Sequence, residues 1–157
     1  MEFKHLQEVL QRYGEAFRNK LQENLLKDGS NASGGLTNSI RYIYEGKGGT
    51  FSVSIGLEDY WKYVNDGTKP HFPPVSAIRK WVEIKPVIPE ADANGRVPTV
   101  GQLAFLIARK ISIEGTEGTH FFDRTQEEIN DYFLLSIEKA VSEDLDEEVD
   151  SVLIQLK

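Results

Sequence analysis

The first 25 residues carry the pattern that most constrains the fold of this chain. Seven apolar residues recur there at spacings of three and four: Phe3, Leu6, Leu10, Tyr13, Phe17, Leu21 and Leu25. This spacing lines them along one face of an α-helix. Gly29 follows and can supply a left-handed C-terminal cap, whereas Gly14 weakens the middle of the helix by about 1 kcal/mol relative to alanine. We therefore predict a long amphipathic helix that packs against the rest of the chain.

After a glycine- and serine-rich connection over residues 28–38, the apolar period changes from helical to two. Ile40, Tyr42 and Tyr44 alternate with polar or exposed positions, and so do Phe51, Val53, Ile55 and Leu57 after a turn over residues 46–49. Alternation on both sides of a glycine-rich turn predicts a β-hairpin over residues 40–57 with one buried face. Ser52 and Ser54 then face water.

The middle of the chain is divided by prolines. The aromatic segment 60–64 leads into a turn over residues 65–68, which includes Gly67 and Thr68, and Pro70, Pro73 and Pro74 follow. Pro73 or Pro74 suits the first turn of a helix. Val75, Ile78, Trp81 and Val82 give this helix one apolar face, and we expect it to end before Pro86. Residues 86–98 read as a loop.

Two further helices are predicted from capping-box spacings. Thr99 and Gln102 predict a helix start that precedes the apolar residues Val100, Leu103, Leu106, Ile107 and Ile111, and Thr125 and Glu128 repeat the spacing. The last helix carries a row spaced strictly by four: Ile129, Phe133, Ile137, Val141, Leu145 and Val149. Each step of four overshoots the helical repeat by about 40°, so the row drifts around the helix. Either the helix ends near Asp144, or its second half packs on something else; residues 152–156 are compatible with strand or helix.

The order of these elements predicts an α+β fold. A small antiparallel sheet, formed by the hairpin 40–57 and possible further strands, packs against the N-terminal helix and the later helices. A length of 157 residues favours a single domain over residues 1–157, and residues 143–157 form an acidic C-terminal extension.

Composition excludes several kinds of site. The absence of cysteine excludes thiol catalysis, disulfides and cysteine-bound zinc. The longest apolar run, Leu103–Ala108, is far shorter than the ~20 residues of a membrane span, so we expect no membrane contact. The net charge is −7, whereas a nucleic-acid binder needs a basic face. Six acids cluster near the C-terminus: Glu143, Asp144, Asp146, Glu147, Glu148 and Asp150.

Histidines provide the one candidate for a metal site. His71 and His120 lie in loops, and with Asp123, Asp66 or Asp59 they could form a site of two histidines and one carboxylate. The alternative is that both histidines fill loops and hydrogen-bond to the backbone. Their separation along the chain favours neither interpretation. No serine lies in a Gly-x-Ser-x-Gly elbow.

Aromatic residues are the most distinctive feature of the loop-rich segments. Seven of them do not all fit easily into a core of this size: Tyr60, Trp61, Tyr63, Phe72, Trp81, Phe121 and Phe122. Aromatic side chains at a surface mark interfaces more often than catalytic sites. The alternative is a small core beneath the loops, and both interpretations stay open.

The segment Tyr60-Trp61-Lys62-Tyr63-Val64-Asn65-Asp66-Gly67-Thr68, directly after the hairpin, resembles a motif of tailed-phage proteins. The motif is Tyr-x-x-Tyr/Phe-Val-x-x-Gly-Thr of the tail-completion or neck proteins, which are head–tail connector subunits often described as minor tail proteins. The prolines of 69–74 with Ile78 and Trp81 resemble a subtype with an inserted helix. The apolar run 103–111, Gly115-Thr116 and an aromatic pair before the last helix also fit.

The resemblance covers residues 1–142. The family has a Pro-Phe pair where this chain has His120-Phe121-Phe122, and residues 143–157 have no counterpart. It implies a structural α+β subunit, without catalysis or cofactor, that forms a six- or twelve-fold ring with copies of itself. Its other implied partners are the portal or adaptor and tail or other neck proteins, in a virion assembled in the host cytoplasm.

In this reading Gly67, Thr68 and Pro70 form a structural turn, and DNA passes the ring without sequence-specific binding. The six acids then either line the channel and repel DNA, or form a solvated outer face. Two other functions stay open. One is a metal-dependent hydrolase or nuclease that uses the loop histidines, and the other is a prophage-encoded module that binds a host protein.

Overall fold

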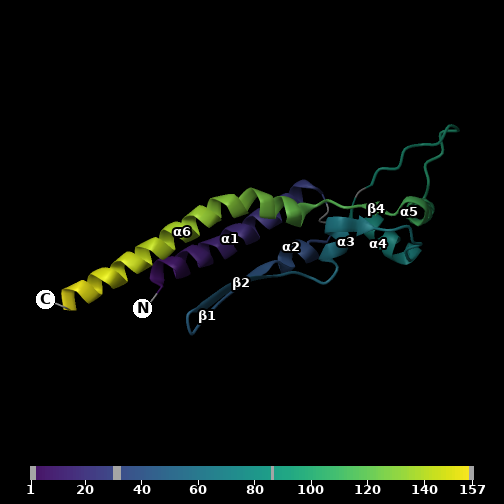
Figure 1. Ribbon diagram of the computed structural model, residues 1–157. Helices are drawn as coiled ribbons and strands as arrows, with labels where there is room; N and C mark the ends of the chain where they lie inside the picture. The colour runs from purple at the N-terminus through teal and green to yellow at the C-terminus, as the bar shows by residue number, and fades with distance from the viewer. Residues whose placement is uncertain (1–2, 30–32, 86, 156–157) are drawn as a thin grey trace.

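The computed structural model describes residues 3–29, 33–85 and 87–155 and has the α+β architecture predicted from the sequence. Its elements are α1 (Lys4–Lys27), α2 (Gly35–Ser39), β1 (Arg41–Lys47), β2 (Thr50–Gly56), α3 (Trp61–Asp66), β3 (Gly67–Thr68), α4 (Val75–Ile84), α5 (Val100–Glu114), β4 (Thr116–Glu117) and α6 (Phe121–Gln155). Helices α1 and α6 lie side by side and run in opposite directions, the hairpin lies along α1, and α4 and α5 lie at the end far from both termini (Figure 1).

The core lies between α1 and α6. It buries Val9, Phe17, Leu21 and Leu25 from α1 and Phe121, Ile129, Phe133 and Ala140 from α6, together with Leu36 and Ile40. The ring of Tyr13 meets that of Phe133 edge to face at 4.8 Å, and its hydroxyl donates to Asn130 Oδ1 at 3.1 Å. The predicted N-terminal helix is confirmed, and Gly29 follows it with a φ of +63°.

The predicted hairpin is confirmed as the antiparallel pair β1–β2, in which Tyr42 faces Ile55 and Tyr44 faces Val53. These four side chains are half-buried, while Ser52 and Ser54 are exposed. The hairpin crosses α1 at Gly14, where an added Cβ would lie 2.5 Å from the ring of Tyr42. Gly14 therefore weakens the helix but permits the close packing of the sheet.

Helix α6 begins earlier than predicted. It starts at Phe121, so the prediction that Thr125 caps the helix is wrong. Thr125 lies fully buried inside the helix, where its hydroxyl donates to the carbonyl of Phe121 and accepts from Asn24 Nδ2. The capping-box spacing alone cannot distinguish a cap from a buried threonine one turn into a helix, because both place a glutamate three residues on.

Helix α6 also runs past Asp144, and residues 152–155 are helical; residue 156 lies outside the described residues. The apolar row spaced by four rotates away from α1 along the helix, as its spacing predicts. Ile129 and Phe133 are buried, whereas Leu145 and Val149 are 46% and 56% exposed. The contact with α1 continues instead through Ala140 and Asp144, which are buried.

Asp144 is the last buried residue of α6 among the described residues. Its carboxylate accepts hydrogen bonds from the backbone N–H groups of His5 and Leu6, each at 2.9 Å, in the first turn of α1. Because α1 begins there, the last 11 residues of α6, 145–155, extend beyond it by about 16 Å at the usual helical rise. We call this segment the overhang.

Helices α4 and α5 form a separate unit, which we call the lobe (residues 69–115). It is inserted between the strands β3 and β4, which pair with each other. The predicted capping box of α5 is confirmed, since Thr99 and Gln102 exchange hydrogen bonds in both directions. Helix α4 ends at Ile84, ahead of the proline at position 86, as expected. The loop over residues 87–98 extends away from both helices (Figure 1).

Candidate functional site

Asn65, in the segment 60–68, connects α3 to the start of α6. It is buried, and its side-chain oxygen accepts from the backbone N–H of Phe122 at 2.9 Å. Its amide nitrogen donates to Asp66 Oδ1 at 2.6 Å and to Asp123 Oδ2 at 3.0 Å, and its carbonyl accepts from the N–H of His120. The buried side-chain amide thus provides an acceptor for one N–H in the first turn of α6, where helical N–H groups have no partner of their own.

Two glycine–threonine pairs, Gly67-Thr68 and Gly115-Thr116, join the lobe to the region around Asn65. Gly67 ends α3 with a φ of +77° and Gly115 ends α5 with a φ of +75°. A Cβ at either position would overlap a carbonyl oxygen, that of Thr116 for Gly67 and that of Thr68 for Gly115. The hydroxyls of Thr68 and Thr116 lie 2.9 Å apart across the pair. Gly67 and Thr68, which were expected in a turn, form the short strand β3, and its partner strand β4 was not anticipated from the sequence.

The candidate metal residues are only partly brought together. Asp66, His120 and Asp123 place potential ligand atoms within 4.8 Å of one another, and all three are exposed. His71 is not part of this group and its Nδ1 lies 2.9 Å from the carbonyl oxygen of Lys69, which matches the loop-filling alternative. Both carboxylates also accept from Asn65, so the cluster has a structural explanation as the cap region of α6.

The seven candidate interface aromatics divide into two sets. Phe121 is fully buried in the core, so its prediction as an interface residue is wrong; α6 begins at this residue and turns it toward α1. Trp61 and Phe122 are half-buried, with ring centroids 4.8 Å apart, and pack against the same core. These residues fit the alternative of a small core beneath the loops. The exposed set is Tyr60, Tyr63, Phe72 and Trp81.

More of the lobe's apolar side chains are exposed than are fully buried. Its fully buried apolar side chains on the two helices are Val82, Ala104 and Ala108. Its exposed large ones are Phe72, Trp81, Ile84, Val87, Ile88, Val97, Val100, Phe105, Leu106 and Ile113. A groove between the helices is lined by apolar residues, among them Ile78, Trp81, Ile107 and Ile111, and by the charged residues Lys110, Glu114 and Glu117. A monomeric soluble protein rarely leaves so much adjoining apolar surface uncovered, so the lobe is a candidate interaction surface.

The six residues of the acidic cluster also divide into a buried residue and more exposed ones. Asp144 is buried against the start of α1, so it belongs neither to a channel lining nor to a solvated outer face, and that prediction is wrong for this residue. Asp146, Glu147 and Asp150 are exposed, and Glu143 and Glu148 are half-buried. The sequence could not separate Asp144 from its neighbours, because its role depends on where α1 begins.

Hydrogen bonding fixes the charge of Asp144. Burial opposes ionisation, but the N–H groups of Leu6 and His5 and the His5 ring outweigh it and lower the pKa of Asp144 below its usual value. In return, the hydrogen bond to Asp144 raises the pKa of His5, assisted by Glu147, whose Oε1 lies 3.8 Å from Nε2. A negatively charged carboxylate at the start of α1 also interacts favourably with the positive end of the helix dipole.

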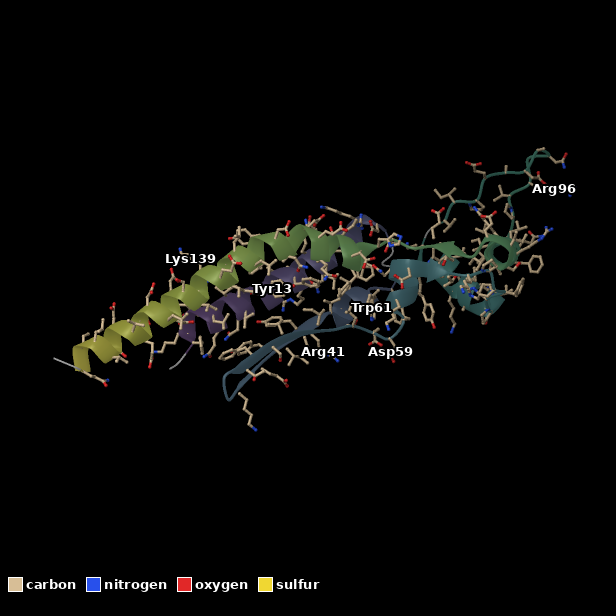
Figure 2. The ribbon with its side chains drawn as sticks, viewed as in Figure 1. Tyr13, Arg41, Asp59, Trp61, Arg96 and Lys139 are labelled. Carbon is tan, nitrogen blue, oxygen red and sulfur yellow. The ribbon has the colours of Figure 1, made fainter. Side chains whose placement is uncertain are left out.

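The overhang is the second candidate interaction surface. It exposes Leu145, Val149, Val152, Leu153 and Ile154 among acidic residues. Figure 2 shows side chains projecting from this part of α6, while the lobe, which ends in the loop of Arg96, carries its side chains at the other end. The candidate functional site is therefore a pair of apolar surfaces rather than one cleft.

No protein-family model matches this sequence, and the comparisons with curated proteins and with solved structures find no match either. Within residues 3–29, 33–85 and 87–155, no helix combines the length and the apolar character that crossing a membrane requires.

Proposed function

We propose that this chain is a structural subunit of a tailed-phage neck or tail, which forms a ring that joins the portal or head to the tail and lets DNA pass. The observation that carries the proposal is the pair of exposed apolar surfaces at opposite ends of an elongated molecule. A subunit with two different interaction surfaces can bind its copies head to tail through one repeated contact. Such contacts close into a ring when the rotation between neighbouring subunits divides a full turn.

The motif of residues 60–68 supports the same proposal. Asn65 holds the start of α6, and Gly67 and Thr68 hold the base of the lobe. The motif thus positions the lobe on the body, which is a task for a protein whose surfaces must meet partners at a fixed angle. The resemblance to tail-completion proteins rests on these same residues.

The test is electron microscopy of the purified chain, alone and mixed with isolated portal-containing particles. We expect rings in the first sample or density added at the portal in the second. A chain that stays monomeric in the first and leaves the particles bare in the second would overturn the proposal. Particles that already carry a bound neck are the matched control, since their docking surface is covered.

A divalent-cation site is a second candidate, favoured by the grouping of Asp66, His120 and Asp123. Calorimetric titration with Zn²⁺ or Mn²⁺ tests it against the variant His120→Gln. Saturable binding that this variant abolishes, together with hydrolytic activity, would replace the structural proposal with an enzymatic one.

A further inference from the structure

The overhang has an apolar strip that α1 does not use. Leu145, Val149 and Val152 are spaced by four and three, which places them on one face of α6. The face that packs on α1 passes through Ala140 and Asp144, one residue earlier in the sequence. One residue corresponds to about 100° around a helix, so the strip points away from the direction of α1.

The lobe lacks the element that would cover it. Two short helices have one shared interface, and each apolar side chain outside that interface stays in water unless a third element packs on it. Trp81 lies at the groove between α4 and α5, with the ammonium of Lys85 5.4 Å from its ring. Lys110 lies at the same groove and forms an ion pair with Glu114 at 3.7 Å, and Glu117 also lines the groove. A helix with an apolar strip therefore matches the apolar side chains of this groove.

Formal charge differs sharply between the two surfaces. Residues 69–115 contain seven basic and four acidic residues, a charge of +3, in a chain whose net charge is −7. The overhang contains Asp146, Glu147, Glu148 and Asp150 and no basic residue. Two overhangs side by side would repel each other, whereas an overhang on a lobe brings unlike charges together.

Position excludes an internal contact. The overhang and the lobe lie at opposite ends of the molecule (Figure 1), so one copy cannot cover its own lobe. Each copy therefore offers one overhang and one lobe to other copies. This arrangement gives a head-to-tail contact, which differs from a two-fold contact because the two partners use different surfaces.

We propose that the overhang of α6 docks on the α4–α5 lobe of a second copy of this chain, with Val149 and Val152 against the groove at Trp81, and that the opposite net charges of overhang and lobe favour this contact. The inference rests on the proposed function, because it names the surfaces through which the ring closes. The acids of the overhang then meet a neighbouring subunit instead of DNA.

Complementary variants test the contact. The overhang variant is Val149→Lys/Val152→Lys, and the lobe variant is Trp81→Glu/Lys110→Glu; all four positions are exposed, and circular dichroism verifies the fold of each variant. The overhang variant keeps an intact lobe, and the lobe variant keeps an intact overhang. We expect each variant alone to self-associate at least about tenfold more weakly than the original chain. Mixed together, they should form a heterodimer and no larger species in sedimentation velocity.

The mixture also separates this inference from the proposed function. Because the chain has no cysteine, a single dye at Ser54→Cys on the hairpin reports binding between the two variants directly. Failure to bind at the highest soluble concentration overturns the head-to-tail contact, even if the original chain forms rings through other surfaces. A heterodimer supports the contact even if no ring binds a portal. Ile43→Lys, on the exposed face of the hairpin, is the matched control and should leave association unchanged.

Discussion

The body of the molecule and its lobe both contain packed helices, but they differ in how many apolar side chains they bury. In the body, which comprises α1, the hairpin, α3 and α6 up to Asp144, two long helices bury aromatic and aliphatic side chains along their whole contact. In the lobe, the buried residues of the two helices are two alanines and a valine. The body buries a core of its own, although Tyr132, Leu134 and Leu135 stay exposed on α6, whereas the lobe buries few apolar side chains fully.

This difference shows where apolar periodicity reports on folding and where it reports on association. The stripe of α1 and the apolar face of α5 look alike in the sequence, since both have period 3.6. Only the first is covered within the chain. An apolar face predicts that something packs on it, but not whether that partner belongs to the same molecule.

The sharpest test of the comparison is a pair of phenylalanines. Phe121 is fully buried in the body, and Phe105 in the lobe is 51% exposed. We expect Phe121→Ala to lower the free energy of unfolding by about 3–5 kcal/mol, the usual result for a buried aromatic residue. Phe105→Ala should change it by no more than about 0.5 kcal/mol. Urea denaturation followed by circular dichroism measures both, and equal losses would show that the lobe has a core of its own.

The joint between the two regions is the next test. Asn65→Leu keeps the side-chain volume but leaves the N–H of Phe122 without its acceptor and removes the amide from Asp66 and Asp123. A buried donor without a partner costs about 1–3 kcal/mol, so we expect a loss of about 2–4 kcal/mol in all. Asn38→Leu, at an exposed position, is the matched control. Equal melting temperatures for the two variants would show that Asn65 does not stabilise the junction between α3 and α6.

Much of the body could be predicted from the sequence because its signals are local. The period of α1, the alternation in the hairpin and the capping box at Thr99 each depend on residues close together in the chain, and all three are confirmed. The start of α6 was missed because its cap, Asn65, lies 57 residues away from Phe122. The separation of Asp144 from the other acids was missed for the same reason.

Gly14 and Gly101 compare the packing of the body and the lobe directly. Gly14→Ala adds a Cβ that would lie 2.5 Å from the Tyr42 ring and 3.0 Å from Val53, whereas Gly101→Ala, in the first turn of α5, meets nothing within 4 Å. Alanine favours a helix by up to about 1 kcal/mol over glycine, but overpacking costs about 1–3 kcal/mol. We expect Gly14→Ala to destabilise by about 1–2 kcal/mol and Gly101→Ala to stabilise slightly. Thermal denaturation measures both, and a stabilised Gly14→Ala would mean that the hairpin packs loosely on α1.

The smallest expected effect lies at the end of the body, where His5 meets Asp144. The raised pKa of His5 means that its contribution to stability is complete below its ordinary value of 6.5 and is lost as the pH rises through the folded-state pKa. The lowered pKa of Asp144 acts in the opposite direction, because its contribution is present above the ordinary carboxyl value and is lost as the pH falls through the folded-state pKa. The pair therefore stabilises the body most between these two limits.

Urea denaturation at about pH 6 and about pH 8.5 tests the upper limit. We expect the free energy of unfolding of the original chain to fall between these values and that of His5→Gln to change less, because glutamine does not titrate. His71→Gln is the matched control in the lobe, since His71 is exposed and its ring contacts only a backbone carbonyl among the described residues. If His71→Gln flattened the pH dependence as much as His5→Gln does, the titration would belong to the lobe, and the anchoring of α1 by Asp144 would not depend on the charge of His5.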